Sequence, residues 1–102
     1  MEFYSFRFGD LKVAQADPAS PKLIAAEMSF GFKAPDAPAV QAIELTVHVP
    51  HDETKTVAET QRQAYAAAQA LLRAAAGYAG SKSCEALSEE TEKNRAFVVK
   101  AS

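Results

Sequence analysis

The clearest pattern in the chain is a strict alternation of apolar and polar residues from Ile43 to Val49. Because successive side chains of a strand point to opposite faces, this alternation predicts a strand with one covered and one exposed face. Pro50 ends the pattern, since proline has no N–H group for a ladder hydrogen bond. A long alanine-rich segment with helical spacing follows. The chain is therefore expected to form a strand and then a helix, each with one apolar side.

The first segment, residues 2–16, also reads as extended, but its apolar positions change parity. They have one parity before Gly9 and the other after Asp10: Tyr4, Phe6 and Phe8, then Leu11 and Val13. Gly9 and Asp10 form either a tight hairpin turn or a bulge in one long strand. The bulge is favoured, because it brings both sets onto one face once the strand pairs with the next segment.

Two further strands are expected at residues 22–32 and 40–49, with proline-containing loops at 17–21 and 33–38. Folding the chain about these loops predicts a three-stranded antiparallel meander with one apolar face. The expected neighbours on that face in the first pair of strands are Tyr4 with Phe32, Phe6 with Phe30, Phe8 with Met28, Leu11 with Ala26, and Val13 with Ile24. Those in the second pair are Ile43 with Phe30, Leu45 with Met28, Val47 with Ala26, and Val49 with Ile24.

A long helix is expected to cover the apolar face of the meander. Thr56 and Glu59 have the spacing of a capping box, in which each side chain satisfies a backbone N–H at the helix start. Gly77 is the expected helix end, because glycine favours the C-terminal cap position. Small and apolar residues recur at helical spacing: Val57, Ala64, Ala68, Leu71, Leu72 and Ala75. Alanine on this side lets the helix approach the sheet closely.

The remaining segment carries weaker signals. Residues 80–95 are polar and acidic, and we expect either a short helix capped by Ser83 or a mobile segment. Residues 97–99, Phe-Val-Val, suggest a short strand that joins the sheet beside the first strand, in the order 3-2-1-4. The predicted fold is a single α+β domain over residues 1–102: a three-stranded antiparallel meander on one long helix, with a short C-terminal strand added to the sheet.

Charge and composition exclude several classes of protein. The 11 basic and 13 acidic residues give a net charge of −2 and a pI near 5.6, which argues against a protein that follows a phosphate backbone. No apolar run approaches the roughly 20 residues that cross a bilayer, and the N-terminal residues do not resemble a signal peptide. We therefore expect a cytoplasmic protein without membrane partners. Cys84 is the single cysteine, so no intrachain disulfide or cysteine-based zinc site is possible.

Residues with metal-ligand or general-base side chains cluster at one place, namely His48, His51, Asp52 and Glu53. Their spacing does not force them together, because His48 lies on the open face of a strand and His51 begins a loop. The simpler interpretation is an exposed strand histidine and two acids that favour the helix start.

Cys84 has Lys82 nearby, but Glu85 offsets that charge and no base is paired with the thiol. No phosphate loop or nucleophile elbow is present, and no cofactor is expected.

The aromatic strands invite comparison with the stacking platforms of proteins that bind single-stranded nucleic acid, with Arg7 and Lys33 nearby. However, the aromatic residues share a face with Met28 and Leu45, which the helix needs to cover. We therefore expect them to be core residues.

Four other side chains are expected on an interaction surface: Phe3 and Arg7 on the open sheet face, and Tyr65 and Tyr78 at the rim of the helix.

Three functions are compatible with these patterns. The favoured hypothesis is a small non-catalytic protein-binding or assembly module whose partner is a second copy, as a homodimer, or another protein. It follows from an open strand edge and from the lack of a convergent polar site. The second hypothesis is a metal-binding protein or enzyme that uses His48, His51, Asp52 and Glu53. The third is a single-stranded nucleic-acid binder that uses the open sheet face, which the charge balance disfavours.

Overall fold

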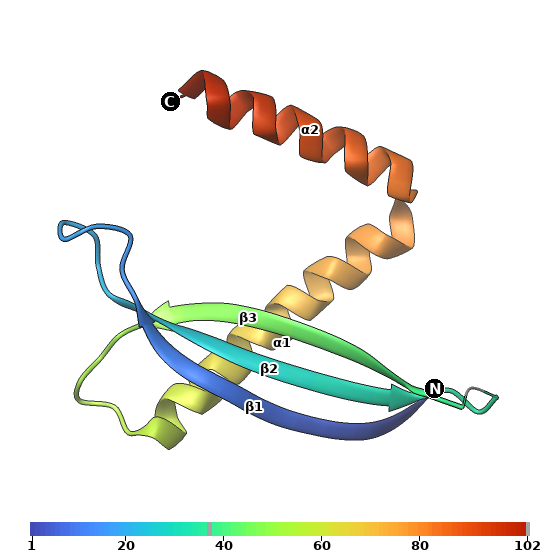
Figure 1. Ribbon diagram of the computed structural model, residues 1–102, viewed down its shortest axis with the longest axis horizontal. Helices are drawn as coiled ribbons and strands as arrows, with labels where there is room; N and C mark the ends of the chain where they lie inside the picture. Colours follow the sequence, from blue (N-terminus) through green and yellow to red (C-terminus); the bar gives the residue numbers. More distant parts are fainter. Residues whose placement is uncertain (37, 102) are drawn as a thin grey trace. The chain divides into compact units, whose positions relative to one another are not determined.

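The computed structural model describes the backbone of residues 1–36 and 38–101, and side chains in these ranges as far as residue 95. Its elements are β1 (Glu2–Ala14), β2 (Leu23–Lys33), β3 (Val40–Pro50), α1 (Val57–Ser81) and α2 (Cys84–Ala101) (Figure 1). Contacts divide the chain into two compact units, Met1–Gln69 and Ala70–Ser102, and α1 belongs partly to each. That the whole chain forms a single domain stays a prediction.

The sheet confirms the predicted antiparallel meander, with β2 between β1 and β3. Every expected apolar pair between β2 and β3 is present, and so are the four expected pairs of β1 that follow Tyr4. The register shifts between Phe8 and Leu11, which confirms the bulge at Gly9 and Asp10. Gly9 has no positive φ. A Cβ placed there would lie 3.1 Å from the Cβ of Glu27, so close strand approach is what favours glycine.

A second irregularity in β1 corrects the expected pairing of Tyr4. The register also shifts between Phe3 and Ser5, so that Phe3, and not Tyr4, lies opposite Phe32. An extra residue reverses the side-chain parity of everything before it. Phe3 therefore lies on the apolar face of the sheet and not on the open face, and its ring meets that of Phe32 edge-on at 6.2 Å. Both residues are largely exposed, Phe3 at 63% and Tyr4 at 62%, so pairing and ring contacts, and not burial, distinguish them.

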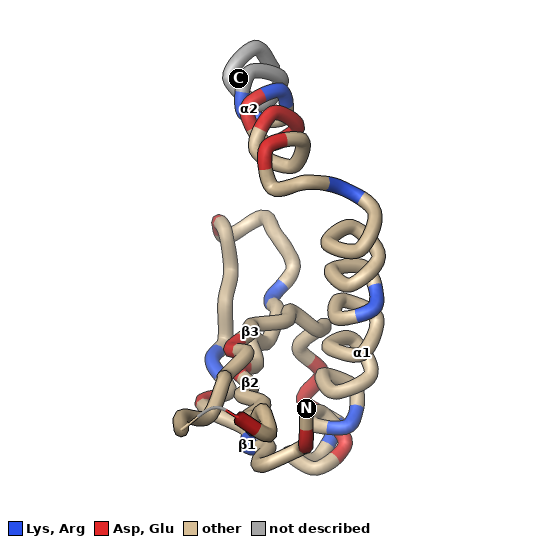
Figure 2. The backbone as a smooth tube through the Cα atoms, turned by 90° about the vertical axis from the view of Figure 1, so that its right-hand side faces the viewer, with Lys and Arg blue, Asp and Glu red and all other residues tan. Residues whose placement is uncertain are grey.

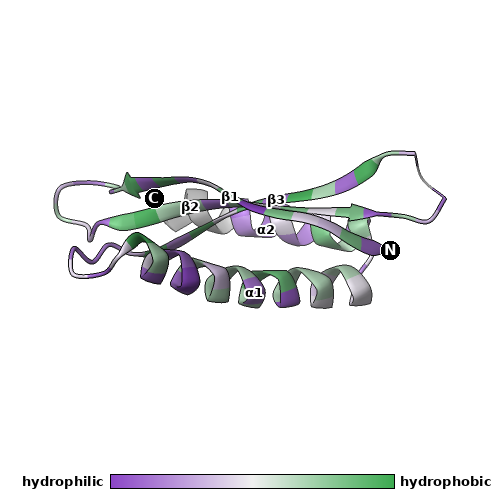
Figure 3. Ribbon diagram, turned by 90° about the horizontal axis from the view of Figure 1, so that it is seen from below, coloured by the Kyte–Doolittle hydropathy of each residue, from purple (hydrophilic) through white to green (hydrophobic). Residues whose placement is uncertain are grey.

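The first half of α1 covers one face of the sheet (Figure 3). Its buried residues are Ala64 and Ala68, both with no exposed surface. Their partners in the core come only from the central strand and β3: Ala26, Met28, Val47 and Val49. The inner residues of β1 and the rings of the central strand are only partly buried against this cluster, namely Phe6, Phe8, Leu11 and Phe30. The fully buried contacts of α1 are thus with β2 and β3, whereas the inner residues of β1 are at most half-buried.

The start of α1 confirms the capping box, whereas its end differs from the prediction. Thr56 Oγ1 accepts a hydrogen bond from the Glu59 N–H at 3.1 Å, and Glu59 Oε1 accepts one from the Thr56 N–H at 3.4 Å. The helix continues past Gly77 to Ser81. Gly77 has no positive φ, so it is an ordinary helical residue and not a cap. The expected inner face also fails at its ends, since Val57 is 65% and Leu71 is 46% exposed.

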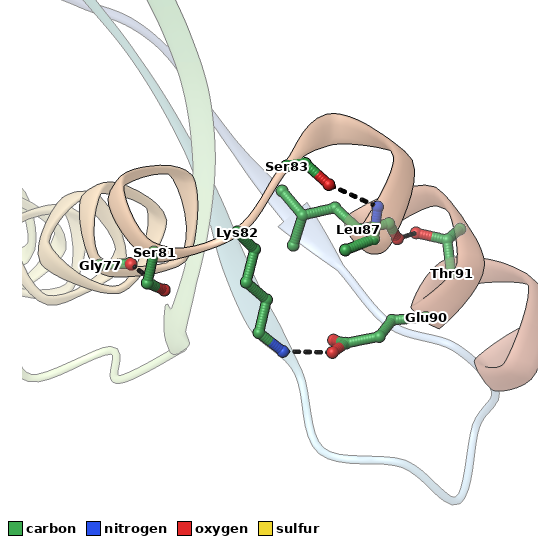
Figure 4. Close-up of polar contacts among 8 residues, drawn as sticks. Gly77, Ser81, Lys82, Ser83, Leu87, Glu90 and Thr91 are labelled. Atoms are coloured by element: carbon green, nitrogen blue, oxygen red, sulfur yellow. Dashed lines mark hydrogen bonds and ion pairs between the residues drawn. The ribbon is translucent and has the colours of Figure 1, made fainter.

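In the second unit, a helix replaces the expected C-terminal strand. Helix α2 includes residues 97–99, and the sheet has three strands among the described residues. Of the two alternatives for residues 80–95, a helix capped by Ser83 is found, because Ser83 Oγ accepts a hydrogen bond from the Ala86 N–H at 3.2 Å (Figure 4). Once Ser83 caps the helix, the helix continues through residues 97–99, because hydrogen bonds within the helix satisfy their backbone N–H and C=O groups. Lys82 forms an ion pair with Glu90 beside this cap (Figure 4).

Candidate interaction surfaces

The outer edge of β3 is a long, regular strand edge. Within the part of the chain that the structure describes, β3 pairs with β2 alone. The pairing runs without a register shift along all 11 residues of β3. Val40 and Ile43 are 42% and 45% exposed. A strand edge of this kind presents a row of backbone N–H and C=O groups that can pair with another chain.

The outer edge of β1 is different, because it contains both register shifts of the sheet. Bulges twist a strand locally and interrupt the row of backbone groups that a new strand needs. Charged side chains reinforce this effect, since Lys12 and Asp10 are exposed and Lys12 Nζ lies 3.8 Å from Asp10 Oδ2 at the bulge of Gly9 and Asp10. The two edges of the sheet are thus unequal, and β3 is the better template for pairing.

An aromatic groove lies between β1 and the first half of α1, and it has a volume of about 580 Å³. Five aromatic side chains line it: Phe3, Phe6, Phe8, Phe30 and Tyr65. The ring of Phe6 is at the centre of this group, with ring centroids at 5.0 Å for Phe8, 4.9 Å for Phe30 and 5.5 Å for Tyr65. Polar groups on the helix side come from Gln61, Arg62 and Gln69. The groove combines an apolar body with a small group of hydrogen-bond donors.

The open face of the sheet holds a shallow hollow of about 590 Å³. Its charged residues are Arg7, Glu27 and Glu44, one from each strand. Both signs of charge are mixed along the strands (Figure 2). A phosphate backbone on this face would meet two carboxylates for each guanidinium, which disfavours the binding of nucleic acid there.

The residues of the histidine and acid cluster lie in separate local settings. His48 is exposed on the open face opposite Ala25, and the His51 N–H donates to the Lys22 carbonyl at 3.1 Å. The Asp52 carboxylate accepts hydrogen bonds from the Thr54 hydroxyl at 2.6 Å and the Thr54 N–H at 2.9 Å. These bonds lower the pKa of Asp52 and tie it to the turn before α1. Glu53 is exposed. Among the described residues, no group of three or more His, Cys, Asp and Glu side chains is arranged to hold a metal ion.

Cys84 is exposed at the start of α2. The neighbouring Glu85 carboxylate has a lowered pKa, because it accepts a hydrogen bond from its own backbone N–H and further ones from Cys84 and Ser83. Lys82 is engaged with Glu90, which raises the pKa of the lysine. A cation that is already paired and a carboxylate beside the sulfur do not activate a thiol.

The four side chains predicted for an interaction surface are divided among three places. Phe3 and Tyr65 both line the aromatic groove, Arg7 lies at the hollow on the opposite sheet face, and Tyr78 belongs to the second unit. There the Lys82 ammonium lies 5.3 Å from the centre of the Tyr78 ring. The sequence did not single out Arg62. The signal for it was its place one turn before Tyr65 on α1.

None of the helices in the described part of the chain has both the length and the apolar character that crossing a membrane requires. Comparisons of the chain with protein-family models, with curated proteins and with solved structures found no match. We therefore base the functional proposals on the geometry of the β3 edge and of the aromatic groove.

Proposed function

We propose that the protein is a small non-catalytic assembly module, and that it forms a homodimer by pairing the free edge of β3 with β3 of a second copy. The observation that carries this proposal is the contrast between the two sheet edges. The edge of β3 is unbulged over 11 residues, whereas β1 is interrupted twice. Natural proteins normally protect a long, regular edge, and a partner strand is one form of protection.

The polar side chains of β3 favour one register for this pairing. In a symmetric antiparallel pair, a residue on the two-fold axis lies opposite its own copy, and side chains directly opposite share a face. With Thr46 on the axis, Glu44 lies opposite the second copy's His48, and the second copy's Glu44 lies opposite His48. Moving the axis to Glu44 would instead place two carboxylates opposite each other, which is unfavourable.

The same register matches the apolar face. Leu45 would lie opposite the second copy's Val47, and Ile43 opposite the second copy's Val49. Ile43 is 45% exposed and Leu45 is half-buried, so the pairing would cover apolar surface that the single chain leaves open. Both copies would keep their α1 helices on the same side of one continuous sheet.

Cysteine cross-linking tests the register. In a Cys84→Ser background, Thr46→Cys should form a disulfide-linked dimer on mild oxidation, because residues opposite each other are about 4.5–5.5 Å apart at Cα. Glu44→Cys is the matched control. Its two copies would be separated by about 14 Å along the strands, so no disulfide should form. Efficient cross-linking of Glu44→Cys with none at Thr46→Cys would overturn this register.

Light scattering combined with charge exchange tests the association itself. Glu44→Lys should shift the equilibrium toward monomer, because it removes the carboxylate opposite the second copy's His48. The double variant Glu44→Lys with His48→Glu should restore the dimer, because a lysine at position 44 would then lie opposite a glutamate at position 48 of the second copy, twice in each dimer. A wild-type protein that remains monomeric at high concentration would contradict the proposal. A dimer that ignores both changes would place the interface elsewhere.

A further inference from the structure

We infer that the aromatic groove is a binding site for a small amphipathic carboxylate, with the apolar body against Phe6, Phe30 and Tyr65 and the carboxylate on Arg62. This site is separate from the β3 edge, and it does not depend on self-association.

The groove is open where α1 presents alanines between the longer residues of its lining. Ala58 and Ala66 line the groove from α1, and neither is long enough to cover the rings of the sheet. Among the described residues, the fully buried core consists of residues of β2, β3 and two alanines of α1. Phe6, Phe8 and Phe30 are consequently left half-buried, although they lie on the inner face of the sheet. Water in contact with such rings is released when an apolar ligand replaces it.

The dimensions and shape of the groove suit a small molecule. Its volume of about 580 Å³ falls within the range of roughly 300–1,000 Å³ that is typical of small-ligand sites. The rings of Phe6 and Tyr65 meet edge-on, with an angle of 87° between their planes, and Phe6 and Phe8 do so at 83°. Aromatic rings held at such angles offer both faces and edges to a bound chain or ring.

The polar side of the groove selects an anion. Among the described residues, Arg62 is the only charged one in the lining, and none of them forms an ion pair with it. A guanidinium presents a fixed fork of N–H donors that matches the two oxygens of a carboxylate. Gln61 and Gln69 add amide donors on the same helix side. A ligand that complements this lining has one negatively charged group next to an apolar body.

Titration with defined probes tests this inference. Decanoate represents an alkyl carboxylate and 4-phenylbutanoate an aryl carboxylate, whereas decylamine carries the opposite charge on the same chain. Calorimetry should give one saturable site for at least one carboxylate and much weaker binding of decylamine. The ratio of the two carboxylate affinities then distinguishes an aliphatic from an aromatic source. Proton NMR should show shifts at the rings of Phe6, Phe30 and Tyr65.

Two variants of arginine separate a binding role from a structural one. Arg62→Gln should weaken carboxylate binding by about tenfold or more, because it removes a charge-assisted hydrogen bond. Arg73→Gln is the matched control, since Arg73 lies further along α1 and outside the groove, and it should bind as the wild type does. Circular dichroism checks that both variants remain folded.

Several results would overturn the inference. They are the absence of saturable binding by either carboxylate, equal affinity for decylamine, and equal losses in Arg62→Gln and Arg73→Gln. Shifts at Phe6 and Tyr65 that appear on concentrating the protein alone would assign the groove to a second copy instead. Failure of the β3 cross-link would leave the carboxylate site untouched, so the two proposals fail independently.

Discussion

Replacing Met28 by alanine is the most direct test of the observed core. Met28 is 2% exposed at the centre of β2, between Phe8 of β1 and Leu45 of β3. The substitution removes three buried heavy atoms beyond Cβ, and at about 0.8 kcal/mol for each the lost transfer free energy is about 2.4 kcal/mol. Phe8 and Leu45 are only half-buried and can relax into the space. The total loss should therefore be about 2–3 kcal/mol, in the lower part of the range for such substitutions.

Chemical denaturation at fixed protein concentration measures this loss of unfolding free energy. A fixed concentration is needed because self-association would add to the apparent stability. Val13→Ala is the matched control, since Val13 lies in the same sheet but is 59% exposed, and it should cost less than about 1 kcal/mol. Surface substitutions typically change the unfolding free energy by up to about 0.5 kcal/mol. If the unfolding free energy of Met28→Ala lies within that range of the wild-type value, Met28 is not a core residue and the placement of α1 is wrong.

Three other predictions address the helices and the turn before them. Gly77→Ala should stabilise α1 by about 0.5–1 kcal/mol in thermal unfolding, because a Cβ there meets nothing within 4 Å; a destabilised variant would contradict a helical Gly77. Thr56→Ala should cost about 1 kcal/mol in the same assay through loss of the cap, whereas Thr56→Ser should not. The lowered pKa of Asp52 means that its hydrogen bonds stabilise the turn above about pH 3.8 and are lost as the pH falls through the lowered value. NMR titration of the Thr54 amide should show this loss, and a Thr54 amide that does not respond to acid would refute it.

The sheet was predictable because several independent signals agreed. The proline-containing loops fixed where the chain reverses, and the parity of apolar residues then left a single register that placed them on one face. The bulge at Gly9 and Asp10 followed from the same arithmetic. The second irregularity was not predictable in this way. Phe3 and Tyr4 are adjacent aromatic residues, so the sequence gives no reason for one of them, in place of the other, to lie on the apolar face.

The ends of the helices were hard to predict, because the sequence signals at those positions are compatible with both a helix end and a continuing helix. Gly77 has the residue type of a helix cap, but glycine is also tolerated inside a helix at a cost of about 1 kcal/mol. Residues 97–99 have high strand propensity, but they follow a helix that Ser83 has already capped. In both cases the favourable backbone hydrogen bonds of the continuing helix outweigh a local preference.

The aromatic groove depends on where the helix lies across the sheet, which periodicity alone does not specify. The sequence placed Ala64 and Ala68 on the inner face of α1, as observed. It did not show that their fully buried contacts are with β2 and β3, or that the inner residues of β1 are at most half-buried. Phe6 and Phe30, expected to be deeply buried, are consequently accessible from the groove.

The two bulges of β1 have a consequence for how far an assembly could grow. In a dimer paired through β3, the six-stranded sheet would have β1 of one copy at each outer border. Both borders would then be kinked near each bulge and carry the exposed Lys12 and Asp10 charges. Such borders do not accept further strands, so growth would stop at a closed pair and not continue into a fibre.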